Sequence, residues 1–145
     1  MLGRLARWLR AVGCDAAQLP IETPDAALVE FARREDRILL TRDGHLLREL
    51  RPHRAVRIRS DAPLEQLREV VGTCGIARPR ELFTRCLVCN ETLAEARLEE
   101  VRDRVPPGAR DVPGPLRRCP VCERVYWRGS HARRMEAALA TAFAD

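Results

Sequence analysis

Apolar residues at the start of the chain recur at helical spacing. One stripe holds Leu2, Leu5, Trp8, Leu9 and Val12. Arg4, Arg7 and Arg10 fall on the opposite side when successive residues are turned by about 100°. Gly13 follows directly. The pattern therefore predicts an amphipathic helix over residues 1–12 that ends at this glycine.

Helical and strand-like patterns then alternate. Thr23 is a predicted N-cap, with Pro24 at the first helical position. The predicted elements are a helix to Arg34, a strand over 37–41, a short helix around 46–50, a strand over 55–59, and a helix from Ser60 or Asp61 to Gly72 or Gly75. Alternation across short connections is typical of a parallel sheet flanked by helices. We therefore expect an α/β fold here.

The rest of the chain has a less regular pattern. A charged helical segment is predicted over 94–104, and the Pro- and Gly-rich sequence after it indicates an irregular loop. Apolar residues spaced by four predict a terminal helix over 131–143. The 145 residues thus divide into two predicted domains, 1–80 and 81–145. The second is too small to fold without a staple.

Four cysteines form two matched C-x-x-C pairs, Cys86 with Cys89 and Cys119 with Cys122. This spacing lets each pair hold one side of a tetrahedral ion, and four thiolates leave no open position for a substrate. The pairs therefore predict a structural zinc site. Disulfides or a redox pair are the alternatives, but a redox pair needs no matched second pair. Cys14 and Cys74 stand alone, and we interpret them as small core residues.

The charge of the chain favours a polyanionic partner. All 26 basic residues are arginine, the acidic residues number 21, and the net charge is +5. Such an excess indicates nucleic acid first, although interspersed charges are also found on ordinary solvated surfaces. The chain has no apolar run that could span a bilayer, and its paired thiols are assigned to metal. We therefore expect a cytoplasmic protein without a membrane contact.

Three aspartates are candidate ligands for a catalytic cation. Asp43 follows the strand predicted over 37–41, and Asp61 follows the strand predicted over 55–59. Ligands of open parallel sheets gather at the carboxyl ends of the strands, and converging carboxylates bind Mg²⁺ or Mn²⁺. Asp25 projects from the start of its helix. A favourable interaction with the helix dipole is the alternative for Asp25, and an N-cap role is the alternative for Asp61.

Arginine and aromatic side chains are candidate contacts to nucleic acid. Arg4, Arg7, Arg10 and Arg42 are placed near the presumed active end, and guanidinium groups pair well with phosphate. Trp127, after the second cysteine pair, could stack on an unpaired base. The alternatives are a solvated surface for the arginines and ribbon packing for Trp127.

Several sequence blocks carry a family resemblance. They are Leu2-Gly3-Arg4-Leu5-Ala6-Arg7-Trp8-Leu9-Arg10, Ile38-Leu39-Leu40-Thr41-Arg42-Asp43, Gln66-Leu67-Arg68-Glu69-Val70, Arg85-Cys86-x-x-Cys89-Asn90, and the run from Cys119 to His131. Their order and spacing resemble the Mut-seven C-terminal RNase domain family over nearly the whole chain. The resemblance implies a PIN-like parallel sheet flanked by helices, followed by a zinc ribbon, with metal-dependent ribonuclease activity. It also implies that Asp25 and Asp43, and less closely Asp61, belong to the catalytic site.

One part of the family pattern has no counterpart here. In the family, a first strand ending in an acidic residue stands immediately before the Leu-Gly-x-Leu-Ala-Arg block, whereas this sequence opens at Met1 with that block. Either the start is assigned too late, or the protein lacks a central strand and a principal ligand. We favour the first interpretation, which translation of the DNA upstream of Met1 tests.

Two main functions compete on this basis. As an enzyme, the protein hydrolyses RNA phosphodiester bonds with Mg²⁺ or Mn²⁺, and zinc has a structural role. As a catalytically impaired RNA-binding or adaptor module, it binds RNA through arginines and does not depend on Asp43. A zinc-stapled interaction domain without a nucleic-acid role is a third alternative.

Overall fold

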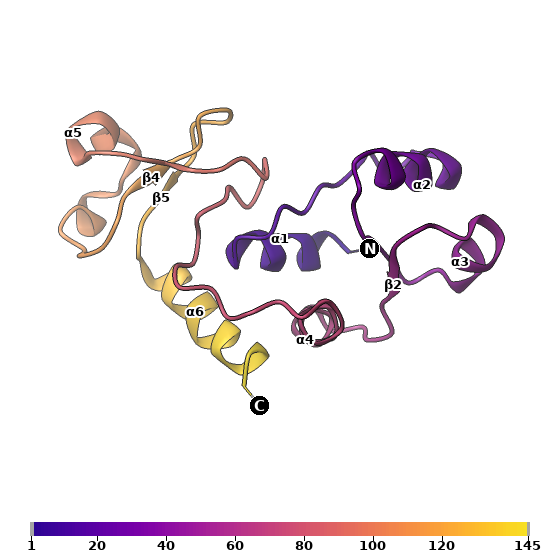
Figure 1. The fold of residues 1–145 in the computed structure, drawn as a ribbon. Coiled ribbons are helices and arrows are strands. Elements are labelled where there is room, and N and C mark those ends of the chain that lie inside the picture. Colours follow the sequence, from indigo (N-terminus) through magenta and orange to yellow (C-terminus); the bar gives the residue numbers. More distant parts are fainter. Residues whose placement is uncertain (1, 145) are drawn as a thin grey trace.

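The computed structural model describes residues 2–144 and shows a mixed α/β protein (Figure 1). The first part contains α1 (Gly3–Ala11), α2 (Asp25–Arg34), β1 (Leu39–Thr41), α3 (Gly44–Leu50), β2 (Ala55–Arg57) and α4 (Pro63–Cys74). The second part contains β3 (Ala94–Glu95), α5 (Leu98–Val101), the 3₁₀ helices η1 (Arg102–Arg104) and η2 (Pro107–Ala109), β4 (Arg117–Arg118), β5 (Val125–Tyr126) and α6 (Ser130–Ala142). The predicted α/β class is therefore confirmed. Within residues 2–144, no helix combines the length and the apolar character that crossing a bilayer needs.

β1 and β2 form a parallel pair, in which Leu39 lies opposite Ala55 and Thr41 lies opposite Arg57. Parallel pairing brings the carboxyl ends of both strands to the same edge, as the sequence pattern predicts. Each strand is three residues long, which is shorter than expected.

The boundaries of β2, α4 and α2 differ from the predicted ones. Beyond β2, the N–H of Ser60 donates to the carboxylate of Glu69 on α4 at 2.7 Å, so this strand does not continue as predicted. α4 begins after Ala62, and the expected cap at Ser60 or Asp61 is wrong. α2 likewise begins one residue later than predicted, with Pro24 as its N-cap residue.

The main hydrophobic core lies where α1 packs on α4 and α4 packs on α6. Its buried residues are Leu5, Leu9, Ala11, Val12, Ile58, Leu67, Val70, Leu87, Met135, Leu139 and Ala142. Leu87 stands between the first two paired cysteines, and the last three residues belong to α6. The core thus takes side chains from both sides of the predicted boundary at residue 80. That boundary stays a prediction.

The second part is built on a small antiparallel sheet in the order β3-β4-β5. Ala94 pairs with Arg118, so the helix predicted over 94–104 is wrong at its start, and only α5 and η1 are helical there. The buried core of this sheet consists of Cys86, Leu93 and Cys119. Because so small a core cannot hold a sheet by itself, this part is compatible with a zinc ribbon.

Candidate functional sites

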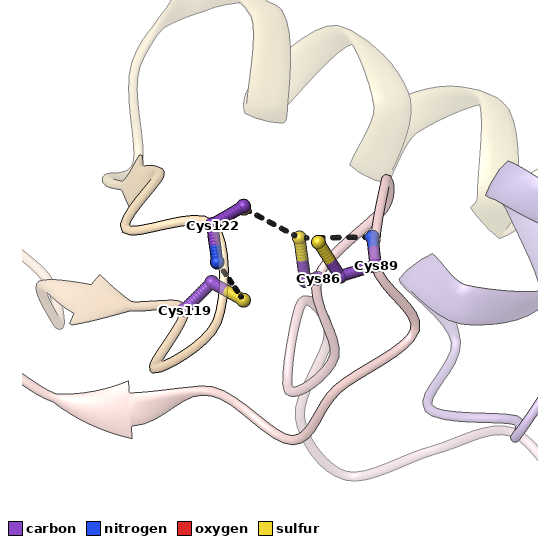
Figure 2. Close-up of side chains that lie close together, drawn as sticks. All are labelled: Cys86, Cys89, Cys119 and Cys122. Atoms are coloured by element: carbon purple, nitrogen blue, oxygen red, sulfur yellow. Dashed lines mark hydrogen bonds between the residues drawn. The ribbon is translucent and has the colours of Figure 1, made fainter.

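Figure 2 shows the two cysteine pairs facing each other from separate loops. The four Sγ atoms all lie within 4.8 Å of one another, and Cys86 Sγ is 3.6 Å from Cys122 Sγ. Zn–S bonds of about 2.3 Å place the sulfurs of a tetrahedral site about 3.8 Å apart, whereas a disulfide joins sulfurs at about 2.05 Å. The quartet is therefore positioned to bind a metal ion, and zinc is the ion that suits four thiolates.

The first cysteine loop is closed by backbone hydrogen bonds. The N–H of Cys86 donates to the carbonyl of Glu91 at 2.8 Å, and the N–H of Asn90 donates to the carbonyl of Cys86 at 3.0 Å. Asn90 adopts a left-handed conformation with φ of 66°. The N–H of Cys89 points at Cys86 Sγ over 3.3 Å, which favours the thiolate that a metal requires.

The second cysteine loop repeats this geometry. The N–H of Cys119 donates to the carbonyl of Arg124 at 2.9 Å, and the N–H of Glu123 donates to the carbonyl of Cys119 at 2.9 Å. Glu123 has φ of 64°, and the N–H of Cys122 lies 3.5 Å from Cys119 Sγ. Two loops with one geometry therefore present their thiols from opposite sides.

Two of the thiols, Cys89 and Cys122, differ in how readily they ionise. A hydrogen bond with Cys122, together with burial and the other thiols, raises the pKa of Cys89 to about 12. Burial acts to raise the pKa of Cys122, but hydrogen bonds with Arg124 and with neighbouring thiols outweigh it and lower that pKa to about 6. Crowded thiols repel one another as they ionise, and a bound cation removes this cost.

Tyr126 on β5 supports the first cysteine loop from the ribbon side. Its hydroxyl accepts the N–H of Leu87 at 3.0 Å and donates toward Cys86 Sγ at 3.2 Å. Burial, followed by the hydrogen bond with Cys86, raises the pKa of this phenol. Tyr126 is therefore an outer support of the metal centre.

Arg10 ties α1 to the first cysteine loop. The residue is only 5% exposed, and its guanidinium donates to the carbonyl oxygens of Ala16, Leu87 and Val88 at 2.7 to 3.2 Å. Burial lowers its pKa, although a guanidinium stays charged in proteins. Carbonyl groups occupy the donors of Arg10 and the protein covers it, so this geometry gives no support to its contact with RNA, which stays a prediction.

A second link joins the loop after α1 to the same cysteine loop. The side-chain oxygen of Asn90 accepts the N–H of Ala16 at 3.0 Å, and its amide donates to Asp15 at 2.6 Å. Arg37 donates two hydrogen bonds to the same carboxylate. The hydrogen bonds from Arg37 and Asn90 lower the pKa of Asp15. Arg10 and Asn90 together fix the metal centre to the body of the protein.

Asp43 stands at the carboxyl end of β1 and caps α3. Its Oδ1 accepts the N–H groups of His45 at 2.8 Å and Leu46 at 3.2 Å. Hydrogen bonds from the backbone of Leu46 and His45 lower the pKa of Asp43, so the carboxylate is ionised near neutral pH. Among residues 2–144, its Oδ2 accepts no hydrogen bond and is open to a ligand.

Asp61 lies beyond the carboxyl end of β2 and pairs with Arg42, the residue before Asp43. Its side chain is 87% exposed. Arg57 covers Gly44 so closely that a Cβ there would come within 2.8 Å of the guanidinium carbon. We call the group Arg42, Asp43, Arg57 and Asp61 the β1–β2 edge. It combines two carboxylates with two guanidinium groups.

Asp25 does not complete a cation site with these two aspartates. It is exposed in the first turn of α2. Within residues 2–144, the cysteine quartet is the one group of three or more potential metal ligands that come together. The predicted convergence of Asp25, Asp43 and Asp61 is therefore not seen, since Asp43 caps a helix and Asp61 holds Arg42. Mg²⁺ can bind one or two carboxylates when substrate phosphates supply further oxygens, so the edge fits such an ion only together with a phosphate.

Trp127 lines a groove of about 930 Å³ between the ribbon, the start of α6 and the segment before the first cysteine loop. We call it the ribbon groove. Arg7 lines the same groove from α1, whereas Arg4 is exposed outside it. Arg42 is half-buried at the β1–β2 edge. Contacts of these four residues with RNA stay predictions.

The supports of the metal centre were not identified from the sequence. Arg10 gave no local signal, because the carbonyl of Leu87 lies 77 positions away. Asn90 appears in the sequence analysis only as the last residue of a family block. Asparagine tolerates the left-handed backbone that a turn after a cysteine pair requires, and its amide can form hydrogen bonds there. Tyr126 follows the second pair closely, and a buried phenol beside thiols needs a partner. That requirement was the available signal.

Comparison with known proteins agrees with this arrangement. The sequence model of one family, described as the Mut7-C RNAse domain, matches residues 1–139. No curated protein and no solved structure matches the chain. The matched region includes α1, the β1–β2 edge and both cysteine pairs. The resemblance carried by the sequence blocks is thereby confirmed, and the protein belongs to the Mut7-C RNAse domain family.

Proposed function

We propose that this protein is a ribonuclease that hydrolyses RNA phosphodiester bonds at the β1–β2 edge with a divalent cation. Family membership supports action on RNA. The observation that carries the location is that Asp43 and Asp61 follow parallel strands at the same end of the sheet, next to Arg42 and Arg57. Ligands of parallel sheets bind at this end.

Each residue of the edge has a distinct role in the proposed reaction. Asp43 and Asp61 would hold Mg²⁺ or Mn²⁺ jointly with phosphate oxygens of the RNA. When bound, such an ion activates water for attack on phosphorus. Arg42 and Arg57 would neutralise the phosphate, because guanidinium groups form charge-assisted hydrogen bonds with it. For Asp61 to reach the ion, Arg42 must leave this carboxylate and turn to the phosphate.

Cleavage of a labelled single-stranded RNA tests this proposal. Wild-type protein should cleave when Mg²⁺ or Mn²⁺ is added and should not cleave when neither is added, and Asp43→Asn should reduce the rate by about 100-fold or more. Asparagine caps a helix as well as aspartate does, so this variant should keep its fold. Asp103→Asn, an exposed aspartate in the ribbon, is the matched control. Cleavage without added Mg²⁺ or Mn²⁺, or full activity of Asp43→Asn, would rule out this centre.

An RNA-binding or adaptor module without catalysis is the second candidate. The ion pair that neutralises Asp61 favours it, as does the lack of a third converging carboxylate among residues 2–144. This function predicts RNA binding that weakens steeply with salt and is the same in Asp43→Asn. Binding with this salt dependence and without cleavage by the wild type would select it.

A further inference from the structure

The ribbon groove carries an excess of positive charge. Six arginines and two glutamates line it. Both glutamates are already paired, Glu81 with Arg117 at 3.0 Å and Glu136 with Arg128 at 3.1 Å. Within residues 2–144, Arg7 and Arg80 form no ion pair, and both are exposed at the groove. The groove therefore attracts a polyanion.

Aromatic side chains gather in the same place. Only six residues of the chain are Phe, Trp or Tyr, and three of them, Phe83, Tyr126 and Trp127, line the groove. The hydroxyl of Tyr126 is bound at the metal centre, so this ring is held in the wall. Arginines beside aromatic rings are typical of surfaces that bind single-stranded nucleic acid.

The indole of Trp127 packs against the backbone of the chain. A Cβ at Gly129 would come within 2.7 Å of its Nε1, so the ring lies directly against the backbone of that glycine. Trp127 is half-buried, and its indole N–H donates no hydrogen bond within residues 2–144. A ring that is packed on one side and borders an open groove on the other is suited to stack a base.

We infer that the ribbon groove binds single-stranded RNA, with one unpaired base stacked on Trp127 and the adjoining phosphates on Arg7 and Arg80. A double helix does not fit, because its bases are stacked inside and its major groove is too narrow for side chains. The inference rests on the proposal that RNA is the substrate. It adds a second contact region, since the groove takes no residue from α2, α3 or the β1–β2 edge.

Binding of fluorescein-labelled oligouridylate, measured by anisotropy without added Mg²⁺ or Mn²⁺ and without a chelator that would strip the zinc, tests the inference apart from cleavage. Wild-type protein should prefer the single strand to an RNA duplex of the same length. Trp127→Ala should weaken single-strand binding by roughly 10-fold or more, and Trp127→Phe should restore most of it. Arg7→Gln should reduce the salt slope of binding by about 0.7. The matched control is Arg134→Gln, an exposed arginine of α6 outside the groove, which should bind normally.

Several outcomes would overturn the inference. One is equal affinity of wild type and Trp127→Ala for the single strand, and another is equal affinity of the wild type for single strand and duplex. A third is displacement of the oligonucleotide by polyglutamate at matched charge, which would indicate a site for an acidic protein. Zinc content and circular dichroism establish that each variant is folded, and Arg7→Gln gives a reading if Trp127→Ala is not. Groove binding without any cleavage would reject the proposed hydrolysis alone. Cleavage with unchanged binding in Trp127→Ala would reject the groove alone.

Discussion

The cysteine quartet and the β1–β2 edge differ in how complete they are as sites. The quartet is half-enclosed: Cys86 and Cys119 are fully buried, Cys89 and Cys122 are partly exposed, and the four sulfurs already converge. The edge is open, because Asp43 and Asp61 are exposed to solvent. Each nevertheless has a partner in the protein: Asp43 caps α3, and Asp61 pairs with Arg42. The quartet is organised by the fold, whereas in the proposed reaction the edge is rearranged by its ligand.

This difference follows from the different roles of the two sites, which are to stabilise the fold and, as proposed, to bind a substrate. A closed thiolate site contributes folding free energy, so the surrounding hydrogen bonds hold its loops in place before any substrate arrives. Under the proposed function, the β1–β2 edge must instead admit phosphate, and its carboxylates stay near water until charge neutralisation is supplied. Variants of each site test this contrast.

Cys86→Ser should have the largest effect, because it breaks the closed site. Metal binding to small thiolate sites is worth on the order of 10 kcal/mol, so the ribbon should unfold and the zinc content should fall to near zero. Metal analysis and thermal unfolding of the purified protein measure this. Cys14→Ser changes a half-buried cysteine outside the quartet and should keep its zinc. Equal zinc contents in the two variants would contradict the assignment of the metal to the quartet.

Arg10→Gln should be the next most damaging change. It leaves the carbonyl groups of Ala16, Leu87 and Val88 without their donor in a buried place. The expected loss is roughly 3 kcal/mol of unfolding free energy, together with weaker zinc retention. Chemical denaturation and competition with a zinc chelator measure the two effects. Arg34→Gln, at an exposed position in α2, should change neither. Wild-type stability of Arg10→Gln would show that the metal centre does not depend on α1.

Asp43→Ala should cause a smaller loss, limited to the start of α3. It removes the helix cap and should lower the melting temperature by a few degrees, whereas Asp43→Asn should not. The pKa of Asp43 is lower in the folded protein, so its contribution is present above the unfolded pKa, near 3.9, and is lost as pH falls through the folded value. Melting curves between pH 7 and pH 2.5 should therefore converge for wild type and Asp43→Ala. A difference in melting temperature that stays constant with pH would show that the Asp43 carboxylate does not cap α3.

Asp61→Asn should have the smallest effect on stability. The Arg42–Asp61 pair is exposed, and such pairs contribute about 0.5 kcal/mol or less. Thermal unfolding at low and high salt should hardly separate this variant from the wild type. A loss comparable to that of Arg10→Gln would mean that the edge is as rigidly built as the quartet, and the contrast between the two sites would fail.

The quartet could be predicted from the sequence because its information is local. Each C-x-x-C pair lies within one loop, and the spacing itself specifies how two thiols face a metal. The parallel order of β1 and β2 was likewise predictable from alternating patterns. These features depend on residues near one another in the chain.

The remaining features depend on long-range packing. The helical pattern places Arg10 among exposed arginines, but a long side chain can turn toward carbonyl groups that arrive 77 positions later. Asp43 follows a strand and also precedes a helix, and the sequence does not say which role its oxygens take. The ribbon groove combines α1, β5 and α6, so no single sequence window describes it.

The insertion of Leu87 into the main core has a consequence for the order of events during synthesis. The apolar face of α1 packs on α4, but Leu87 and α6, which complete the same core, are made only with and after the cysteine pairs. Domains fold as they emerge from the ribosome, so metal loading and the completion of this core fall in the same late step. We expect the zinc supply at the moment of translation to set the yield of native protein, and the unloaded nascent chain to be a client of chaperones.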